Sequence, residues 1–244
     1  MPWTNKQVLI IGDSLSDGTS TPGKLLAERL EAAGAQVRIQ AKVGRSAYHF
    51  VTYQDGLRVV ATEIAEHRPD LVLIILGTND LSLGVQPTRS AFAKIKAAFD
   101  RAGIPTYHVG PPAFAQTSLN TSAENIVKIG RELFGGRFID ARPMTQDILT
   151  SAQGRAGDLI HFQPAGARAW AARLADALTR AVEGPAVATE EPGGTRSRLY
   201  GFLGVGAVAA LGALAFILVR RTTLDRRRDR WFTRDDARGL PSRA

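Results

Sequence analysis

The chain has 244 residues, of which 44% are hydrophobic and 22% charged, a composition typical of a folded protein with one substantial core. It contains no cysteine, which excludes disulfides, thiolate metal sites and a cysteine nucleophile. No two of its four histidines are four residues apart, so no metal centre is expected. The formal net charge of +8 arises in a tail, because nine arginines follow residue 219. We therefore expect no nucleic-acid partner for the near-neutral body of the chain.

The first 183 residues alternate short apolar runs with amphipathic segments. Expected strands cover residues 7–11, 37–41, 70–76, 106–109 and 137–140, and expected helices cover residues 57–67, 90–102, 123–134 and 164–182. A further helix is expected to begin at Pro22 and to include Leu25, Leu26 and Leu30. The run at 70–76 is apolar after its first residue, which is typical of a strand buried on both faces of a parallel sheet. Five strands that alternate with helices predict a doubly wound α/β fold. The last helix carries one apolar stripe that we expect to pack on the sheet, formed by Trp170, Leu174, Ala177, Leu178 and Ala181.

After this domain, expected to span residues 1–183, the composition changes. Residues 184–198 are rich in Pro, Gly and Glu and are interpreted as a linker. Residues 199–219 contain no charge, and 21 helical residues are long enough to cross a bilayer, so we expect a transmembrane helix there. Its small residues are spaced in a way that would suit a homodimer through this helix. Residues 220–244 form an arginine-rich juxtamembrane tail.

The orientation of this single-pass anchor is open. Eight basic residues lie within 20 positions after the span and three before it, which favours a cytoplasmic tail and an external catalytic domain. Against this, residues 1–6 lead directly into the first strand without the apolar region of a secretory signal. We slightly favour the external side.

Residues suited to catalysis follow several of the expected strands. Ser14 lies in the turn after the first strand, Gly44 after the second and Asn79 after the third, while Asp158 and His161 share a late loop. The carboxyl ends of parallel strands meet at one edge of the sheet, so the first three segments should converge there. Each segment alone is also compatible with ordinary turn chemistry.

Together these residue types favour acyl transfer. A serine hydroxyl needs a base, and His161 offers an imidazole three residues from Asp158, a carboxylate that would orient it. Acyl transfer also needs donors for the developing oxyanion. The backbone N–H groups of Ser14 and Gly44 and the side-chain amide of Asn79 are suited to that task.

The segments Gly-Asp-Ser-Leu at 12–15, the glycine after the second strand, Gly-Thr-Asn-Asp at 77–80 and Asp-Leu-Ile-His at 158–161 resemble the four sequence blocks of the SGNH/GDSL hydrolase family. The resemblance covers residues 6–182. It implies a flavodoxin-like three-layer sandwich with a five-stranded parallel sheet and no metal or organic cofactor. It also implies Ser14 as nucleophile, His161 as base, Asp158 as its orienting partner, and Ser14, Gly44 and Asn79 as the oxyanion hole. One departure is Phe162, where many members have proline.

Three further residues are candidates for contact with substrate. Asp13 precedes the serine, and Arg45 either binds an anionic substrate or is a solvated loop residue. Phe114 follows the fourth strand and is expected to wall the acyl or leaving-group pocket. His49 is interpreted as a packed or exposed loop residue in preference to a site residue. His67 and His108 are interpreted as structural.

The predicted function is hydrolysis of a carboxylic ester, with O-acetyl groups on envelope carbohydrate as the first candidate substrate and a lysophospholipid or acyl-thioester as the second. The alternative from another class is a catalytically silent, membrane-tethered module that binds carbohydrate. A nucleic-acid binder acting through the tail is disfavoured, because anionic lipid headgroups are the simpler partner beside an apolar span.

Overall fold

The computed structural model describes residues 2–149, 154 and 156–184. Its centre is a parallel sheet with the strand order β2-β1-β3-β4-β5, and every neighbouring pair of strands is parallel. The strands are β1 (Gln7–Gly12), β2 (Gln36–Ala41), β3 (Leu71–Ile75), β4 (Thr106–Val109) and β5 (Phe138–Ile139). This order is that of flavodoxin-like sheets, so the predicted five-stranded parallel fold is confirmed.

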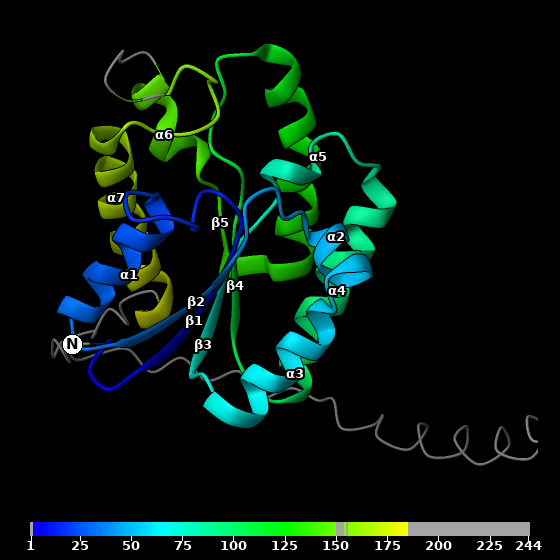
Figure 1. Cartoon of the computed structure of the whole chain (residues 1–244), viewed down its shortest axis with the longest axis vertical. Helices are drawn as coiled ribbons and strands as arrows, with labels where there is room; N and C mark the ends of the chain where they lie inside the picture. The colour runs from blue at the N-terminus through cyan, green and yellow to red at the C-terminus, as the bar shows by residue number, and fades with distance from the viewer. Residues whose placement is uncertain (1, 150–153, 155, 185–244) are drawn as a thin grey trace, which may run out of the picture. The chain divides into compact units, whose positions relative to one another are not determined.

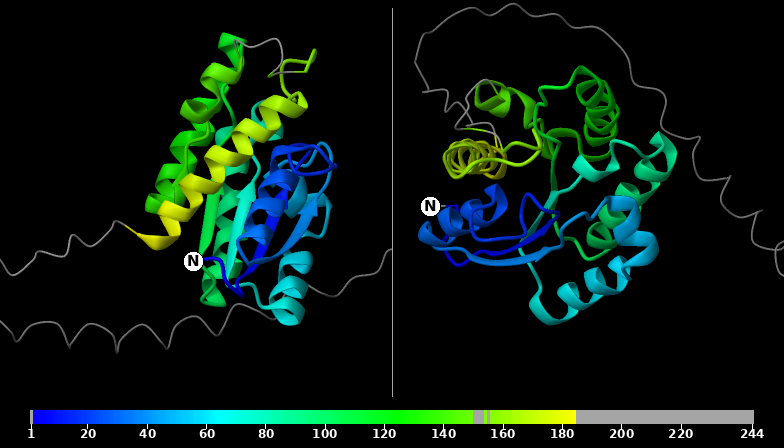
Figure 2. Two further views of the ribbon diagram at one scale, coloured as in Figure 1. Left: turned by 90° about the vertical axis from the view of Figure 1, so that its left-hand side faces the viewer. Right: turned by 45° about the horizontal axis from the view of Figure 1, so that its top comes forward.

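Helices cover both faces of the sheet, which gives three layers (Figures 1 and 2). One face carries α1 (Pro22–Ala32), α6 (Arg142–Leu149) and α7 (Pro164–Glu183). The other carries α2 (Ala47–Tyr53), α3 (Gly56–His67), α4 (Val85–Arg101) and α5 (Thr117–Phe134). Two short 3₁₀ turns complete the described chain, η1 (Thr78–Asp80) after β3 and η2 (Gly135–Arg137) before β5.

The central strand β3 divides the core into two halves. All five of its residues are buried, and they alternate between the two hydrophobic clusters on either side of the sheet. Leu73 belongs to the cluster that contains Trp170, Leu174 and Leu178 of α7, whereas Ile74 faces the cluster on the other side. The apolar stripe of α7 therefore packs on the sheet as predicted. A strand that is hydrophobic on both faces is stable only between two such layers.

Two helices were not expected from the sequence. Both α2 and α6 are short, at 7 and 8 residues, too short for a helical repeat to be recognised in the sequence. In addition, α4 and α5 begin five and six residues earlier than expected, because their first turns are largely polar and exposed. The differences are confined to helix ends and to connections between the strands.

The expected C-terminal elements lie almost entirely outside the described residues. Of the linker at 184–198 only Gly184 is described, and the span at 199–219 and the tail at 220–244 are not. Among the helices that the structure describes, none combines the length and the apolar character needed to cross a membrane. The anchor, its orientation and a dimer through it therefore stay predictions from sequence.

Candidate active site

The loops that follow β1, β2 and β3 meet at the carboxyl edge of the sheet, toward the top of Figure 1. Ser14 lies in the turn after β1, and its Oγ is 2.8 Å from Nε2 of His161. The other ring nitrogen of His161, Nδ1, is 2.5 Å from Oδ2 of Asp158. Ser14 and His161 are 147 residues apart in sequence, yet in the structure they form a hydrogen-bonded chain of three side chains with Asp158.

The loop before α7 owes its shape to Asp158. Its Oδ1 accepts hydrogen bonds of 2.9 Å from the backbone N–H groups of both Ile160 and His161. Leu159, between Asp158 and Ile160, has a left-handed backbone conformation with φ of 62°. The hydrogen bond with the imidazole of His161, followed by these backbone bonds, lowers the pKa of Asp158 to about 2. The carboxylate therefore stays ionised and able to orient the imidazole throughout the neutral pH range.

Two backbone N–H groups, one in the turn after β1 and one in the loop after β2, have no acceptor among the described residues. Within the described residues, the N–H groups of Ser14 and Gly44 make no hydrogen bond, and neither residue belongs to a helix or strand. Gly44 has φ of 73°, a conformation that L side chains rarely adopt. Backbone N–H groups without an acceptor at the carboxyl edge of a sheet are available to an anionic oxygen.

The third expected donor, Asn79, lies in η1. Its Nδ2 donates to Oδ2 of Asp13 and to the backbone oxygen of Arg45, at 3.1 Å in both cases. These two bonds connect the turn after β1 and the loop after β2 to η1. The three segments that hold the expected oxyanion donors are therefore joined through one side-chain amide.

Asp80, the residue after Asn79, connects η1 to α2 from within the core. It is 1% exposed, and its carboxylate accepts from the backbone N–H groups of Ala47 and Tyr48 in the first turn of α2. Burial raises the pKa of Asp80, and the two N–H donors counteract that effect. Sequence reasoning missed this contact. Its only signal was an aspartate directly after Asn79.

Two of the three candidates for contact with substrate, Arg45 and Asp13, have side chains buried in the protein. The guanidinium of Arg45 is turned into the protein, where it donates to Gln54 and to the backbone oxygen of Gln40 and lies 4.7 Å over the ring of Phe50. Arg45 is only 8% exposed, so these neutral protein groups take the place of water around its guanidinium. Asp13 is fully buried and accepts from Leu15 N as well as from Asn79. Both residues nevertheless contact Asn79, because Asp13 Oδ2 and the backbone oxygen of Arg45 accept from its amide.

Phe114, the third candidate for contact with substrate, lines a hollow in the structure. It contributes to the wall of a hollow of about 350 Å³ next to Asn79 and to Ile160, which precedes His161. The described residues that line the hollow carry hydroxyl, amide and apolar groups and no charge: Thr78, Asn79, Leu81, Ser82, Phe114, Ser118, Leu119, Ser122 and Ile160.

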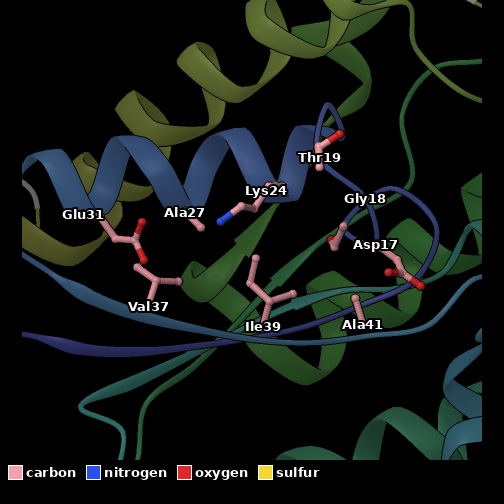
Figure 3. A pocket seen from close by; sticks show the side chains of 10 residues that line it. Asp17, Gly18, Thr19, Lys24, Ala27, Glu31, Val37, Ile39 and Ala41 are labelled. Carbon is pink, nitrogen blue, oxygen red and sulfur yellow. The ribbon is translucent and has the colours of Figure 1, made fainter.

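A larger hollow, of about 430 Å³, lies between α1 and β2 (Figure 3). Lys24 and Glu31 of α1 line it opposite Ile39 of β2, and Asp17 lies at the end near the catalytic turn. It contains none of the residues that contact the Ser14 hydroxyl. The position of the serine–histidine pair, and not volume, therefore identifies the candidate site.

The remaining histidines lie outside the site. His49 is exposed on α2 against Tyr48 and Tyr53, and His67 is next to Glu66 at the end of α3. His108 is buried in β4 among three phenylalanine rings. No cluster of carboxylates and histidines suited to a metal ion occurs in the described part of the chain. Phe162, the departure from the family pattern, packs on Trp170 with ring centroids 4.9 Å apart.

Solved structures of similar fold come from several bacteria. An acetyl-xylooligosaccharide esterase, Axe2, from Geobacillus stearmophilus matches with a TM-score of 0.60 at 17% identity, over 81% of this chain and 100% of its own. A psychrotrophic esterase, EstA, from Pseudoalteromonas sp. matches with a TM-score of 0.57 at 17% identity, over 74% and 100%. A carbohydrate acetylesterase family member from Sinorhizobium meliloti matches with a TM-score of 0.57 at 17% identity, over 73% and 99%. At these identities the likeness shows a common fold.

Comparison with curated protein sequences finds no match. Residues 10–169, however, match the model of the GDSL-like Lipase/Acylhydrolase family. This range includes the segments that hold Ser14, Gly44, Asn79, Asp158 and His161. The match spans more than half of the sequence, and the chain is therefore an enzyme of the GDSL-like lipase/acylhydrolase family, the SGNH hydrolases.

Proposed function

We propose that the protein hydrolyses carboxylic esters through an acyl-enzyme formed on Ser14. The observation that carries this proposal is the hydrogen-bonded chain from Ser14 Oγ through His161 to Asp158. Nε2 of His161 takes the hydroxyl proton as Ser14 Oγ attacks the ester carbonyl, and Asp158 stabilises the imidazolium that forms. The imidazolium then gives this proton to the leaving alcohol, and the C–O bond to the alcohol breaks.

Water completes the cycle. His161 takes a proton from a water molecule that attacks the acyl carbonyl, and the collapse of the second tetrahedral intermediate returns that proton to Ser14 Oγ. In both steps negative charge develops on the carbonyl oxygen. The unpaired N–H groups of Ser14 and Gly44 and the amide of Asn79 are the donors that would bind it.

We propose an O-acetylated carbohydrate as the substrate class. The described residues that line the hollow beside Asn79 are uncharged, which suits a neutral group that bonds to the hydroxyls of Ser118 and Ser122 and packs on Leu119. Two proteins of the same fold are named as esterases of acetylated carbohydrate. A lysophospholipid is the less favoured candidate, because no Lys or Arg that would bind its phosphate is among the described residues that line the hollow.

The experiment is a substrate panel with the full-length protein. Acetylated sugars, p-nitrophenyl esters of increasing chain length, a lysophospholipid and an acyl-thioester are compared for wild type and Ser14→Ala. We expect turnover of the acetyl esters that disappears in the variant. Preference for the lysophospholipid or the thioester would contradict the substrate class alone. Absence of Ser14-dependent turnover of every ester would contradict the enzyme, and would favour the silent carbohydrate-binding module.

We also propose that the catalytic domain is tethered to a membrane through residues 199–219 with the domain on the external side, a proposal that rests on the sequence alone. Protease treatment of intact cells tests the side. We expect the domain to be digested without lysis, and protection until lysis would contradict an external domain.

A further inference from the structure

Both hydrogens of the Asn79 side-chain amide already have an acceptor in the free protein. A side-chain amide nitrogen carries two hydrogens, and Nδ2 of Asn79 has two acceptors at 3.1 Å, Oδ2 of Asp13 and the backbone oxygen of Arg45. An oxyanion bound by Asn79 must therefore replace one of these two acceptors. The two differ in position, and the difference indicates which one is replaced.

The acceptor on Arg45 lies next in sequence to a second N–H group that is available to the oxyanion. Arg45 directly follows Gly44, which is exposed and whose own N–H has no acceptor among the described residues. The hydrogen of Asn79 that bonds to Arg45 O is thus directed at the segment where a second free donor lies. Asp13, in contrast, is fully buried and accessible to no ligand.

We propose that Asp13 is a positioning residue for ester hydrolysis: its carboxylate holds one N–H of Asn79 from behind, so that the other N–H passes from Arg45 O to the oxyanion. This inference rests on the proposed function. In the free protein Arg45 O occupies the place of the oxyanion and keeps the amide satisfied. Asp13 is then not a contact of the substrate but the group that fixes which face of the amide the substrate meets.

A carboxylate is required at this position because it must accept twice. Oδ1 of Asp13 accepts from Leu15 N at 2.9 Å while Oδ2 accepts from Asn79. An asparagine at position 13 has one oxygen and one NH₂ group, so it would present a donor to one of these two donors. The simplest relief is for the amide of Asn79 to turn over. Its oxygen would then face the oxyanion and repel it.

The test compares kcat and KM of Asp13→Asn, Asn79→Ala and the double variant with an acetyl ester. We expect each single variant to lower kcat by about 100- to 1000-fold, the range for loss of one oxyanion donor, with a much smaller change in KM. The double variant should lose no more than either single variant, because both remove the same hydrogen bond to the oxyanion.

The matched control is Glu63→Gln. Glu63 is also a buried carboxylate, at 3% exposure, but it lies on α3 and accepts from Gln40 and Arg38. We expect its kcat to stay near wild type. Urea unfolding of each variant at the assay temperature shows whether the variant is folded in the absence of urea, under the conditions in which its kcat is measured. If Asp13→Asn does not fold, Asp13→Ser, which is too short to reach Asn79, takes its place.

Three results separate the possible failures. A kcat within about threefold of wild type for the Asp13 variant would overturn the positioning role and leave the proposed function intact. Losses that multiply in the double variant would also overturn it, because the two residues would then act independently. Wild-type protein without Ser14-dependent turnover would instead overturn the proposed function, and this inference with it.

Discussion

His108 should make the protein less stable in acid. The side chain is fully buried in β4, and its ring centroid lies 4.4 Å from that of Phe92 and 5.0 Å from that of Phe134. Nε2 is 3.1 Å from the backbone oxygen of Leu76, while Nδ1 has no partner among the described residues. The neutral ring donates from Nε2 to this carbonyl, and a protonated ring would carry an unpaired N–H and a buried charge.

Burial lowers the pKa of His108 from 6.5 to about 4, and the bond to Leu76 only partly counteracts it. Between these two values the unfolded chain binds a proton that the folded chain does not. Stability is therefore lost as pH falls through 6.5 toward 4. Relative to pH 7.5, the loss at pH 4.5 from this one group is about 2 to 3 kcal/mol, at about 1.4 kcal/mol for each pKa unit.

The assay is urea unfolding of wild type and His108→Leu at pH 7.5 and pH 4.5. Leucine leaves Leu76 O without its donor, which costs about 1–3 kcal/mol at both values of pH and cancels in the difference. Asp13, whose pKa burial raises to about 7, acts in the opposite direction but equally in both proteins. We expect the acid-induced loss to shrink by about 2 to 3 kcal/mol in the variant. The same pH dependence in both proteins would refute a buried neutral His108.

Three further predictions concern the site and the core. Asp158→Asn should lower kcat by about 10⁴-fold with little change in unfolding by urea, because the carboxylate of Asp158 bonds to the imidazole that contacts Ser14 Oγ and would stabilise its protonated form, yet is half exposed. Trp170→Ala should lower the free energy of unfolding by about 3–5 kcal/mol in urea, since the ring is fully buried between α7 and the sheet; a loss under about 1 kcal/mol would contradict that packing. Gly130→Ala places a Cβ 2.3 Å from Phe138 and should destabilise by about 1–3 kcal/mol, whereas Gly136→Ala, which meets nothing within 4 Å, should be neutral; equal effects on Tm would contradict the close contact.

The fold could be predicted because its hydrophobic pattern is local. The apolar run of β3 and the stripe of α7 are visible in the sequence, and both become core. The short helix α2 could not be predicted in the same way. Its N-terminus is held by Asp80, more than 30 residues away in sequence, and no local periodicity encodes that contact.

The candidate site divides in a similar manner. By itself, the sequence determined the five residues suited to acyl transfer. It also determined the sheet edge at which three of them meet, because the carboxyl ends of parallel strands share one edge. The tertiary structure decided the roles of their neighbours. Asp13 and Arg45 look like substrate contacts in sequence, but burial and hydrogen bonds to Asn79, Gln40 and Gln54 turn both inward. Charged side chains have reach enough to point either way from a loop, so only the packed environment, through the free energy of burying each charge, selects the direction.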